Sequence, residues 1–328
     1  MKNKYVFTAI LLAVLLAAGL LIAYGGYRNQ QMNVASAGRD PRQTVRIVTS
    51  FYPVYIAAEN VIGDTEGVEL SNMTGEQTGC LHDYQMTTED MKKLADADVF
   101  LINGGGIESF LETVVEQYPD LVIVNTGAAL EEDEAHEDEE ESHDQEGAHE
   151  EHAHTHGEEN AHYWMDPEKY RIQVEAMAEG LAAADPARAE AYRENAAAYE
   201  SEIQTLIREE EEIRKKTDGQ PVVIFHEAYE YLAEGLGMEI AASLDLDEER
   251  QVSANELAGI LDTIQSRQVP AVFAEALYGE ETGRIVEQET GVQVLYPDTL
   301  VRGSYDPDAY LNGMRENFRQ INEAFHTS

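Results

Sequence analysis

The tract between Leu130 and His162 is rich in side chains that bind metal ions. It holds fifteen carboxylates and six histidines before His162, with no lysine or arginine. Imidazole is a common ligand for borderline metals such as zinc, and an extended acidic tract of it is a local store of weak sites. An acidic linker with incidental histidines is the alternative. We predict weak auxiliary metal binding by the histidines of this tract: His136, His143, His149, His152, His154 and His156.

Three further histidines follow predicted strands elsewhere in the chain. His226 comes directly after a β-branched run, His82 follows another run by a loop, and His162 follows a third after the acidic tract. In open α/β sheets, ligands bind beyond the carboxyl ends of the strands. Asp298 has a similar position late in the chain, and three histidines with one aspartate suit four-coordinate zinc. Each histidine alone could instead be a hydrogen-bonded structural residue.

Short β-branched runs alternate with amphipathic segments from residue 45 onward, which indicates an α/β fold. In the first half we predict strand 45–49, helix 53–62, strand 68–72, helix 89–97, strand 99–103, helix 108–117 and strand 121–125. In the second half we predict strand 222–225, helix 227–235, strand 239–242, a helix capped by Ser253 that ends at Gln268, strand 271–274, strand 292–296 and helix 308–325.

A helix of about thirty residues is predicted between the two halves. It would be opened by Asp185-Pro186 and meets no breaker before Gly219. At 1.5 Å per residue it would span about 46 Å, which is too long for one small domain. We therefore predict two (βα) lobes joined by one long rigid helix, with a metal site in the inter-lobe crevice. The predicted domains are an N-terminal lobe at 45–185 with an insertion at 127–161, the linking helix at 186–217 and a C-terminal lobe at 218–328.

The N-terminal segment has the pattern of an export signal. Lys2 and Lys4 precede an apolar run of nineteen residues at 6–24, close to the ~20 that span a bilayer. Positive charges before the run place the rest of the chain outside the cytoplasm. We predict a signal peptide or, preferably, an uncleaved membrane anchor at 1–24 and a polar tether at 25–44. No cysteine follows the run directly, so we expect no lipid attachment at a mature N-terminal cysteine.

The formal charge of −42 excludes several partners. Without the fifteen carboxylates of the tract the charge is still −27, because −42 + 15 = −27. A nucleic-acid partner would require the opposite sign, and direct contact with anionic lipid is disfavoured. The single cysteine, Cys80, rules out an internal disulfide and any multi-cysteine zinc motif.

Six short motifs occur in an order that resembles the zinc and manganese solute-binding receptors of ABC importers, cluster A-I type. They are Val-Thr-Ser-Phe-Tyr-Pro at 48–53, His-Asp-Tyr at 82–84, Ala-Asp-Val-Phe-Leu-Ile-Asn-Gly at 97–104, His-Tyr-Trp-Met-Asp-Pro at 162–167, Phe-His-Glu-Ala-Tyr at 225–229 and Asp-Thr-Leu at 298–300. The resemblance covers residues 45–325. It implies two (βα) lobes, a linking helix, a metal between the lobes and an acidic histidine loop typical of the zinc branch.

Carried over by motif, the resemblance implies the ligands His82, His162, His226 and Asp298. In manganese-binding relatives a glutamate commonly replaces the third histidine, so His226 favours zinc. The chain departs from the family pattern at Cys80, where some relatives have a glutamate near the metal.

Three further residues could assist the site. A thiolate at Cys80 could join the metal shell, although we favour its interpretation as a small buried hydrophobe. Glu227 and Glu275 are acidic and follow predicted strands. Either could orient a ligand histidine by a hydrogen bond, and solvent exposure is the alternative.

The resemblance implies an extracytoplasmic receptor that captures Zn²⁺ and delivers it to an ABC-type permease. Three imidazoles and a carboxylate leave no position for an activated water, so we expect no enzyme. The alternatives are a manganese or iron receptor of the same type, a secreted zinc metallohydrolase, and a surface metal buffer or adhesin. A hydrolase would show a helical His-x-x-x-His pair, which the three histidines do not form. We expect a monomer at the cell surface, tethered or secreted.

Overall fold

The computed structural model describes residues 44–75, 79–81, 84–131, 160–246 and 252–325. The predicted N-terminal anchor, the six histidines of the acidic tract and His82 lie outside the described residues. Within these ranges, no helix is both long enough and apolar enough to cross a membrane.

The N-terminal lobe is built on a parallel sheet with the strand order β2-β1-β3-β4. The strands are β1 (Val45–Thr49), β2 (Val68–Asn72), β3 (Val99–Ile102) and β4 (Val122–Asn125). The helices that alternate with them are α2 (Tyr52–Ile62), α3 (Thr88–Ala95) and α4 (Leu111–Gln117). Every residue of β3 is buried, as expected for an inner strand covered on both faces.

The C-terminal lobe repeats this arrangement with the strand order β6-β5-β7-β8, again parallel. Its strands are β5 (Pro221–Ile224), β6 (Glu239–Ser243), β7 (Ala271–Phe273) and β8 (Gln293–Leu295). Its helices are α8 (Tyr229–Gly235), α9 (Ala254–Arg267), α10 (Glu280–Thr290) and α11 (Ala309–Ala324). The predicted two-lobed α/β fold is confirmed; α10 is a helix that was not predicted.

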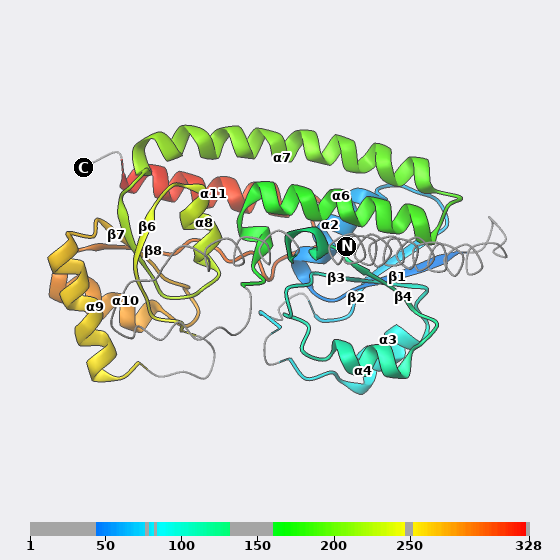
Figure 1. Cartoon of the computed structure of the whole chain (residues 1–328), viewed down its shortest axis with the longest axis horizontal. Helices are drawn as coiled ribbons and strands as arrows, with labels where there is room; N and C mark the ends of the chain where they lie inside the picture. The colour runs from blue at the N-terminus through cyan, green and yellow to red at the C-terminus, as the bar shows by residue number, and fades with distance from the viewer. Residues whose placement is uncertain (1–43, 76–78, 82–83, 132–159, 247–251, 326–328) are drawn as a thin grey trace, which may run out of the picture.

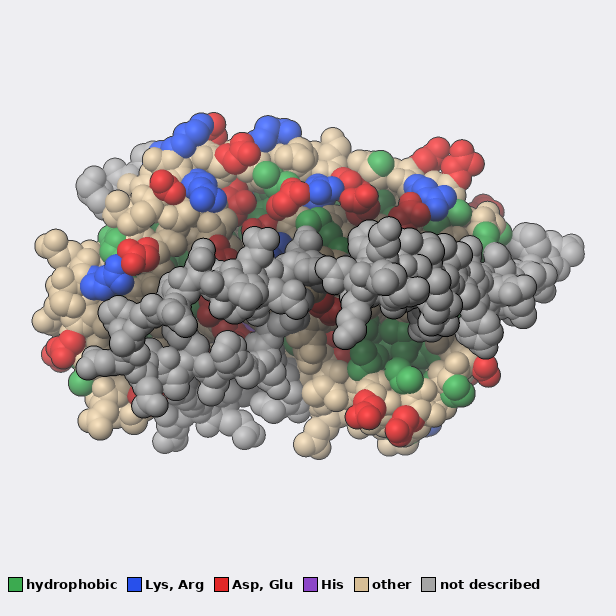
Figure 2. All heavy atoms as spheres, in the orientation of Figure 1, with side chains coloured by type: hydrophobic (Ala, Val, Ile, Leu, Met, Phe, Trp, Pro, Cys, Tyr) green, Lys and Arg blue, Asp and Glu red, His purple; other side chains and the backbone are tan. Residues whose placement is uncertain are grey.

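Helix α7 (Ala189–Thr217) runs along both lobes (Figure 1). Its 29 residues give a length of about 44 Å. Its buried side chains recur every three or four positions, from Tyr192 and Ala196 to Ile213 and Thr217, so one stripe of the helix faces the core. Figure 2 shows acidic and basic side chains intermingled on the surface along the top of the molecule, where α7 runs in Figure 1.

The helix α7 does not begin where the sequence predicted. Asp185 is the C-terminal cap of the preceding helix α6 (Pro167–Ala184), and α7 starts after Arg188. The carboxylate of Asp185 accepts hydrogen bonds from the Arg188 guanidinium at 2.8 Å and the Tyr192 hydroxyl at 3.0 Å. It therefore fastens the corner between the two helices instead of capping the second one.

A second correction concerns the predicted helix at 108–117, because α4 begins at Leu111. Glu108 lies in the turn before it and accepts hydrogen bonds from the backbone N–H groups of Asn103 and Gly104, at 2.7 and 3.2 Å. Burial raises the pKa of Glu108 to about 7, although these bonds oppose the shift. Because the Glu108 carboxyl accepts hydrogen bonds from the backbone at the end of β3, it does not lie in the first turn of a helix.

The main hydrophobic core is continuous from the N-terminal lobe through α6, α7 and α11 to the near side of the C-terminal lobe. A smaller cluster of buried residues, which includes Phe225 and Val272, fills the far side of the C-terminal lobe. Trp164 lies in the main core and is fully buried, and its indole N–H donates to the Thr299 carbonyl of the other lobe at 2.8 Å. This contact ties the loop of His162 to the exit of β8.

Candidate metal centre

Three side chains from different parts of the chain converge between the lobes. The Sγ of Cys80 and one ring nitrogen each of His162 and His226 all lie within 4.8 Å of one another. The Sγ of Cys80 is 3.5 Å from Nε2 of His162, and the two imidazole rings meet edge to face with centroids 5.1 Å apart. Two nitrogens and one sulfur at these separations can hold a borderline or soft divalent cation.

The parallel sheets bring these donors together. Cys80 lies in the loop that follows β2, and His226 follows β5 after one intervening residue. His162 precedes the short 3-10 helix η1 (Tyr163–Met165), in the connection that follows β4. All three connections leave the carboxyl ends of strands, where open α/β sheets place their ligands.

Asn160 sets the orientation of the His162 ring. Its amide N–H₂ donates to the Glu227 carbonyl at 2.9 Å and to the Glu230 carboxylate at 2.8 Å. Its Oδ1 therefore faces His162 and accepts from the backbone N–H at 3.0 Å and from ring Nδ1 at 2.8 Å. Because an amide oxygen can only accept, Nδ1 carries the proton and Nε2 offers its lone pair to the side of Cys80.

A carboxylate faces the corresponding ring nitrogen of His226. The Oε2 of Glu275 is 3.5 Å from Nδ1 of His226. The other oxygen of Glu275 lies 3.6 Å from the Arg302 guanidinium and accepts a hydrogen bond from the Thr299 hydroxyl at 3.4 Å. Both His226 and Glu275 are buried, at 8% exposure each. A negative charge at this distance favours cation binding by the ring, and Arg302 opposes it.

Asp298 is not a member of the three-residue donor group. Its Oδ1 accepts from the backbone N–H of Leu300 at 2.8 Å, and its backbone N–H and carbonyl are both held by the amide of Asn317. It lines a cavity of about 180 Å³ between the lobes, together with Tyr52 and Arg302. As a metal ligand, Asp298 stays a prediction.

The other predicted site residues have mixed positions. Glu227 is half-exposed, and its Oε1 lies 3.7 Å from Nδ1 of His162, beyond hydrogen-bond length. His82 and the tract histidines lie outside the described residues, so their roles also stay predictions. Cys80, interpreted from the sequence as a small hydrophobe, is half-buried beside His162.

Sequence reasoning missed Asn160 and Arg302. Asn160 is the first described residue after the acidic tract, and the composition around it gave no reason to separate it from that tract. The signal available was its spacing, since an Asn or Asp side chain commonly accepts from the backbone two residues on. Arg302 is the single basic residue close to Asp298 in sequence, and only the folded loop brings it to Glu275.

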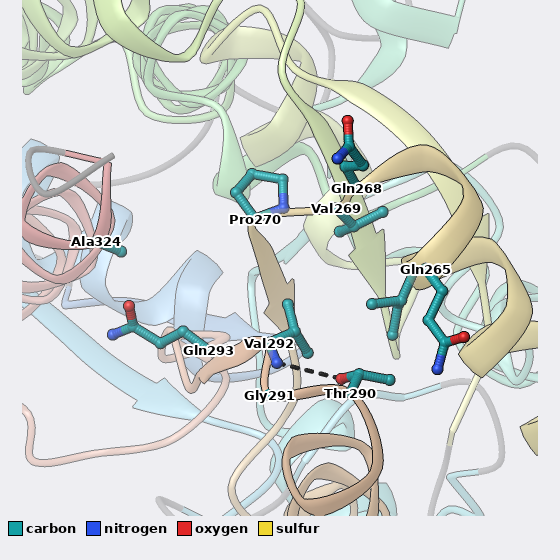
Figure 3. Close-up of a pocket in the computed structure, with 10 residues that line it drawn as sticks. Gln265, Gln268, Val269, Pro270, Thr290, Gly291, Val292, Gln293 and Ala324 are labelled. Carbon is teal, nitrogen blue, oxygen red and sulfur yellow. Dashed lines mark hydrogen bonds between the residues drawn. The ribbon is translucent and has the colours of Figure 1, made fainter.

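A larger hollow lies away from these residues. It has a volume of about 440 Å³ and is lined by amide and apolar side chains such as Gln265, Gln268 and Val269 (Figure 3). Pro270 directly precedes β7, and Gln293 begins β8, so the hollow opens at the amino ends of these strands. Parallel sheets bind ligands at the opposite edge, and this hollow therefore gives no alternative site.

Two α/β lobes, one long helix along both and a donor cluster between them define the class of solute-binding proteins that capture metal ions. The chain belongs to the family described as zinc-uptake complex component A, periplasmic, which matches residues 47–324.

Curated relatives bind different metals. An iron-binding protein of Yersinia pestis, YfeA, is 28% identical and is aligned over 87% of this chain and 88% of its own length. The manganese-binding lipoprotein MntA of Halalkalibacterium halodurans is 26% identical, with 83% and 86% covered. The high-affinity zinc uptake system protein ZnuA of Bacillus subtilis is 24% identical, with 95% and 96% covered. Family membership therefore leaves the metal open.

Solved structures share the fold. The solute-binding protein FpvC of Pseudomonas aeruginosa, in complex with Ni²⁺, superposes with a TM-score of 0.71 at 22% identity and covers 87% of this chain and 98% of its own. Zn(II)-bound AdcA of Streptococcus pneumoniae gives a TM-score of 0.68 at 22% identity. The match covers 86% of this chain but 57% of AdcA, so this chain corresponds to about half of that protein.

Proposed function

We propose that this chain is an extracytoplasmic receptor that captures Zn²⁺ and delivers it to an ABC-type membrane permease. The observation that carries the proposal is the convergence of ring nitrogens from His162 and His226, one from each side of the inter-lobe crevice. A cation held by both lobes would stabilise one relative position of the lobes. A permease that reads this position could distinguish the loaded receptor from the empty one.

The donor chemistry favours zinc over manganese. We propose His82, His162, His226 and Asp298 as the ligand set, as the motifs predict. Imidazole nitrogen suits zinc, whereas manganese accepts oxygen-rich shells more readily and lies lower in the Irving–Williams order. The iron- and manganese-binding relatives make those ions the second candidates.

A carrier also fits this shell better than an enzyme does. Catalytic zinc keeps an open position for water, whereas a shell closed by four protein donors cannot activate one. We propose a monomeric carrier outside the cytoplasm, held near its permease by the N-terminal segment or secreted.

Parallel calorimetric titrations of the purified chain with zinc and manganese test this function. We expect one tight zinc site, with manganese bound at least ~10-fold more weakly, a difference of about 1.4 kcal/mol. Equal affinities would assign the chain to the manganese branch. The absence of any tight divalent site would refute the receptor function.

Deletion of residues 132–159 separates a receptor from a metal buffer. The deletion spares Asn160, which orients His162, and Glu131, which accepts from Gly105 N–H and the Asn125 amide. We expect fewer weak zinc ions per chain and a tight constant within ~2-fold of wild type, because the proposed ligands of the tight site lie outside the tract. If the tight site is lost with the tract, the tract supplies a ligand and the chain is a buffer.

A further inference from the structure

We propose that Cys80 is a thiolate ligand of the bound metal, which makes the site a mixed nitrogen–sulfur shell selective for thiophilic ions. This inference rests on the proposed function, since it concerns the same captured cation. It replaces one member of the proposed ligand set: the Cys80 sulfur takes the place of the Asp298 oxygen beside the three imidazoles.

The spacing of Cys80 and His162 matches two corners of a zinc tetrahedron. Zinc–sulfur bonds of about 2.3 Å and zinc–nitrogen bonds of about 2.0–2.1 Å, at a tetrahedral angle, separate the two donors by about 3.6 Å. The Sγ of Cys80 lies 3.5 Å from Nε2 of His162. One ring nitrogen of His226 lies within 4.8 Å of the Cys80 Sγ and of one ring nitrogen of His162. A small shift of the His226 side chain toward the other two donors would place all three at corners of one zinc tetrahedron.

The direction of the His162 lone pair supports coordination. Asn160 holds the proton on Nδ1, so the nitrogen that faces Cys80 is the one without a proton. His162 is fully buried, and its ring also contacts Trp164 with centroids 5.1 Å apart, so the ring cannot turn away freely. A fixed, unprotonated nitrogen beside a sulfur is the arrangement that a shared cation requires. A thiol–imidazole hydrogen bond of the same length is the competing interpretation.

Sulfur in the shell would sharpen the selectivity of the receptor. Thiolate prefers zinc and softer ions, whereas manganese prefers carboxylate, carbonyl and water. We therefore expect the thiol to add to the preference that the histidines already give. Loss of the sulfur should weaken zinc binding much more than manganese binding.

Cobalt(II) in place of zinc gives the deciding measurement on the full chain. A cysteine ligand produces a sulfur-to-cobalt charge-transfer band in the near ultraviolet, which a shell of nitrogen and oxygen lacks. We expect the band in the wild-type complex and its loss in Cys80→Ser, with zinc affinity lowered ~10–100-fold and manganese affinity by less than ~3-fold. Thr74→Ser, an equally small change in the connection that follows β2, is the matched control and should leave the band and both affinities unchanged.

Alkylation of the wild-type thiol provides a test that needs no variant. Cys80 is the single cysteine of the chain, so the rate of labelling by iodoacetamide reports on it alone. Saturating zinc should slow labelling of the chelator-treated chain at least ~10-fold, because the metal occupies the nucleophilic electron pair. Saturating manganese should slow it much less.

The outcomes separate this inference from the function on which it rests. A tight zinc site without the cobalt band, or with labelling at the same rate as in the metal-free chain, overturns the assignment of Cys80 and leaves the receptor function standing. A chain with no tight site for zinc overturns both.

Discussion

His162 and His226 present imidazoles to the same crevice, but different groups face their second ring nitrogens. Nδ1 of His162 donates to the neutral amide of Asn160 at 2.8 Å. Nδ1 of His226 faces the carboxylate of Glu275 at 3.5 Å, and Arg302 competes for that carboxylate. The surroundings also differ, since His162 is fully buried while His226 retains 8% exposure.

The difference shows that the two imidazoles of one site are held by different groups: a neutral amide orients His162, and a carboxylate faces His226. The ring of His162 is oriented by hydrogen bonds to Asn160, whose amide is held in turn by Glu227 and Glu230 of the C-terminal lobe. His226 follows a strand whose next residue, Phe225, belongs to the smaller core cluster. We infer that hydrogen bonds orient the ring of His162, whereas the charge of Glu275 supports cation binding by His226.

The largest expected effect comes from removing the two histidines in turn. His162→Ala should weaken zinc binding by at least ~100-fold, about 2.7 kcal/mol, and His226→Ala by at least ~10-fold, about 1.4 kcal/mol. The first loses a pre-oriented donor and leaves the acceptor of Asn160 without its ring partner. Competition titration against a zinc chelator measures both constants. Equal losses would remove the proposed difference between the two histidines, and an unchanged constant in His226→Ala would remove the inter-lobe site.

The next effect concerns the stability of the fold at Glu210, a buried carboxyl on α7. Glu210 of α7 is buried against Gly235 of α8, which has no side chain to exclude it, and close to Asp166, which caps α6. Burial first, and then the charge of Asp166, raise the pKa of Glu210 to about 8, and Arg214 opposes the shift.

Between pH ~4.5 and about 8, Glu210 therefore carries a proton in the folded chain, whereas in the unfolded chain, with an ordinary pKa near 4.5, it has released that proton. This contribution to stability is complete below pH ~4.5 and is lost as the pH rises to about 8. Glu210→Gln should raise the free energy of unfolding by about 2 kcal/mol at pH 9 and little at pH 5. Urea unfolding across this range measures it, with the exposed Glu211→Gln as control. A constant difference at all pH values would contradict the shifted pKa.

A smaller effect is expected from the two supporting residues. Asn160→Ala should weaken zinc binding ~10-fold, about 1.4 kcal/mol, because the His162 ring loses its orientation. Asn160→Asp should not restore the affinity, because a carboxylate cannot donate to the Glu227 carbonyl and the Glu230 carboxylate as the amide does. Glu275→Gln should weaken zinc binding ~5-fold, because a negative charge near His226 is removed. Calorimetry of the three variants sharpens the comparison. Full affinity in Asn160→Asp would show that the hydrogen bonds to Glu227 and Glu230 are not needed to orient the His162 ring.

The smallest effect has the opposite sign. Arg302→Met should tighten zinc binding ~3-fold, about 0.6 kcal/mol, because a positive charge leaves the crevice and Glu275 turns fully to His226. Arg315→Met, which removes a guanidinium that pairs with Glu209 on the helix surface, is the control and should change nothing. Weaker binding in Arg302→Met would mean that the arginine holds Glu275 in place.

Local sequence patterns predicted most elements of the fold. β1 and β2 have the predicted limits, and the capping boxes of Thr87 and Ser253 open α3 and α9. Such features depend on neighbours within a few residues, which the sequence states directly. The errors at Glu108 and Asp185 have one cause, since each carboxylate accepts hydrogen bonds from residues three to seven positions away instead of opening the next helix.

For the site, the sequence by itself predicted three imidazoles and a carboxylate after strands, with the Cys80 thiol as a less favoured ligand, and a long helix to bring two sheets together. It favoured Asp298 over Cys80, because the family motif carries the aspartate and a lone cysteine is commonly a small buried hydrophobe. The tertiary structure placed the Sγ of Cys80 at 3.5 Å from His162 and gave Asp298 to the backbone of Leu300. It also recruited Asn160, whose amide donates across the lobes to Glu227, and Arg302, which lies close to Glu275 within the C-terminal lobe. The chemistry of a donor is a property of its residue, whereas its distance from the other donors is decided by segments far apart in the chain, as for Cys80 and His162.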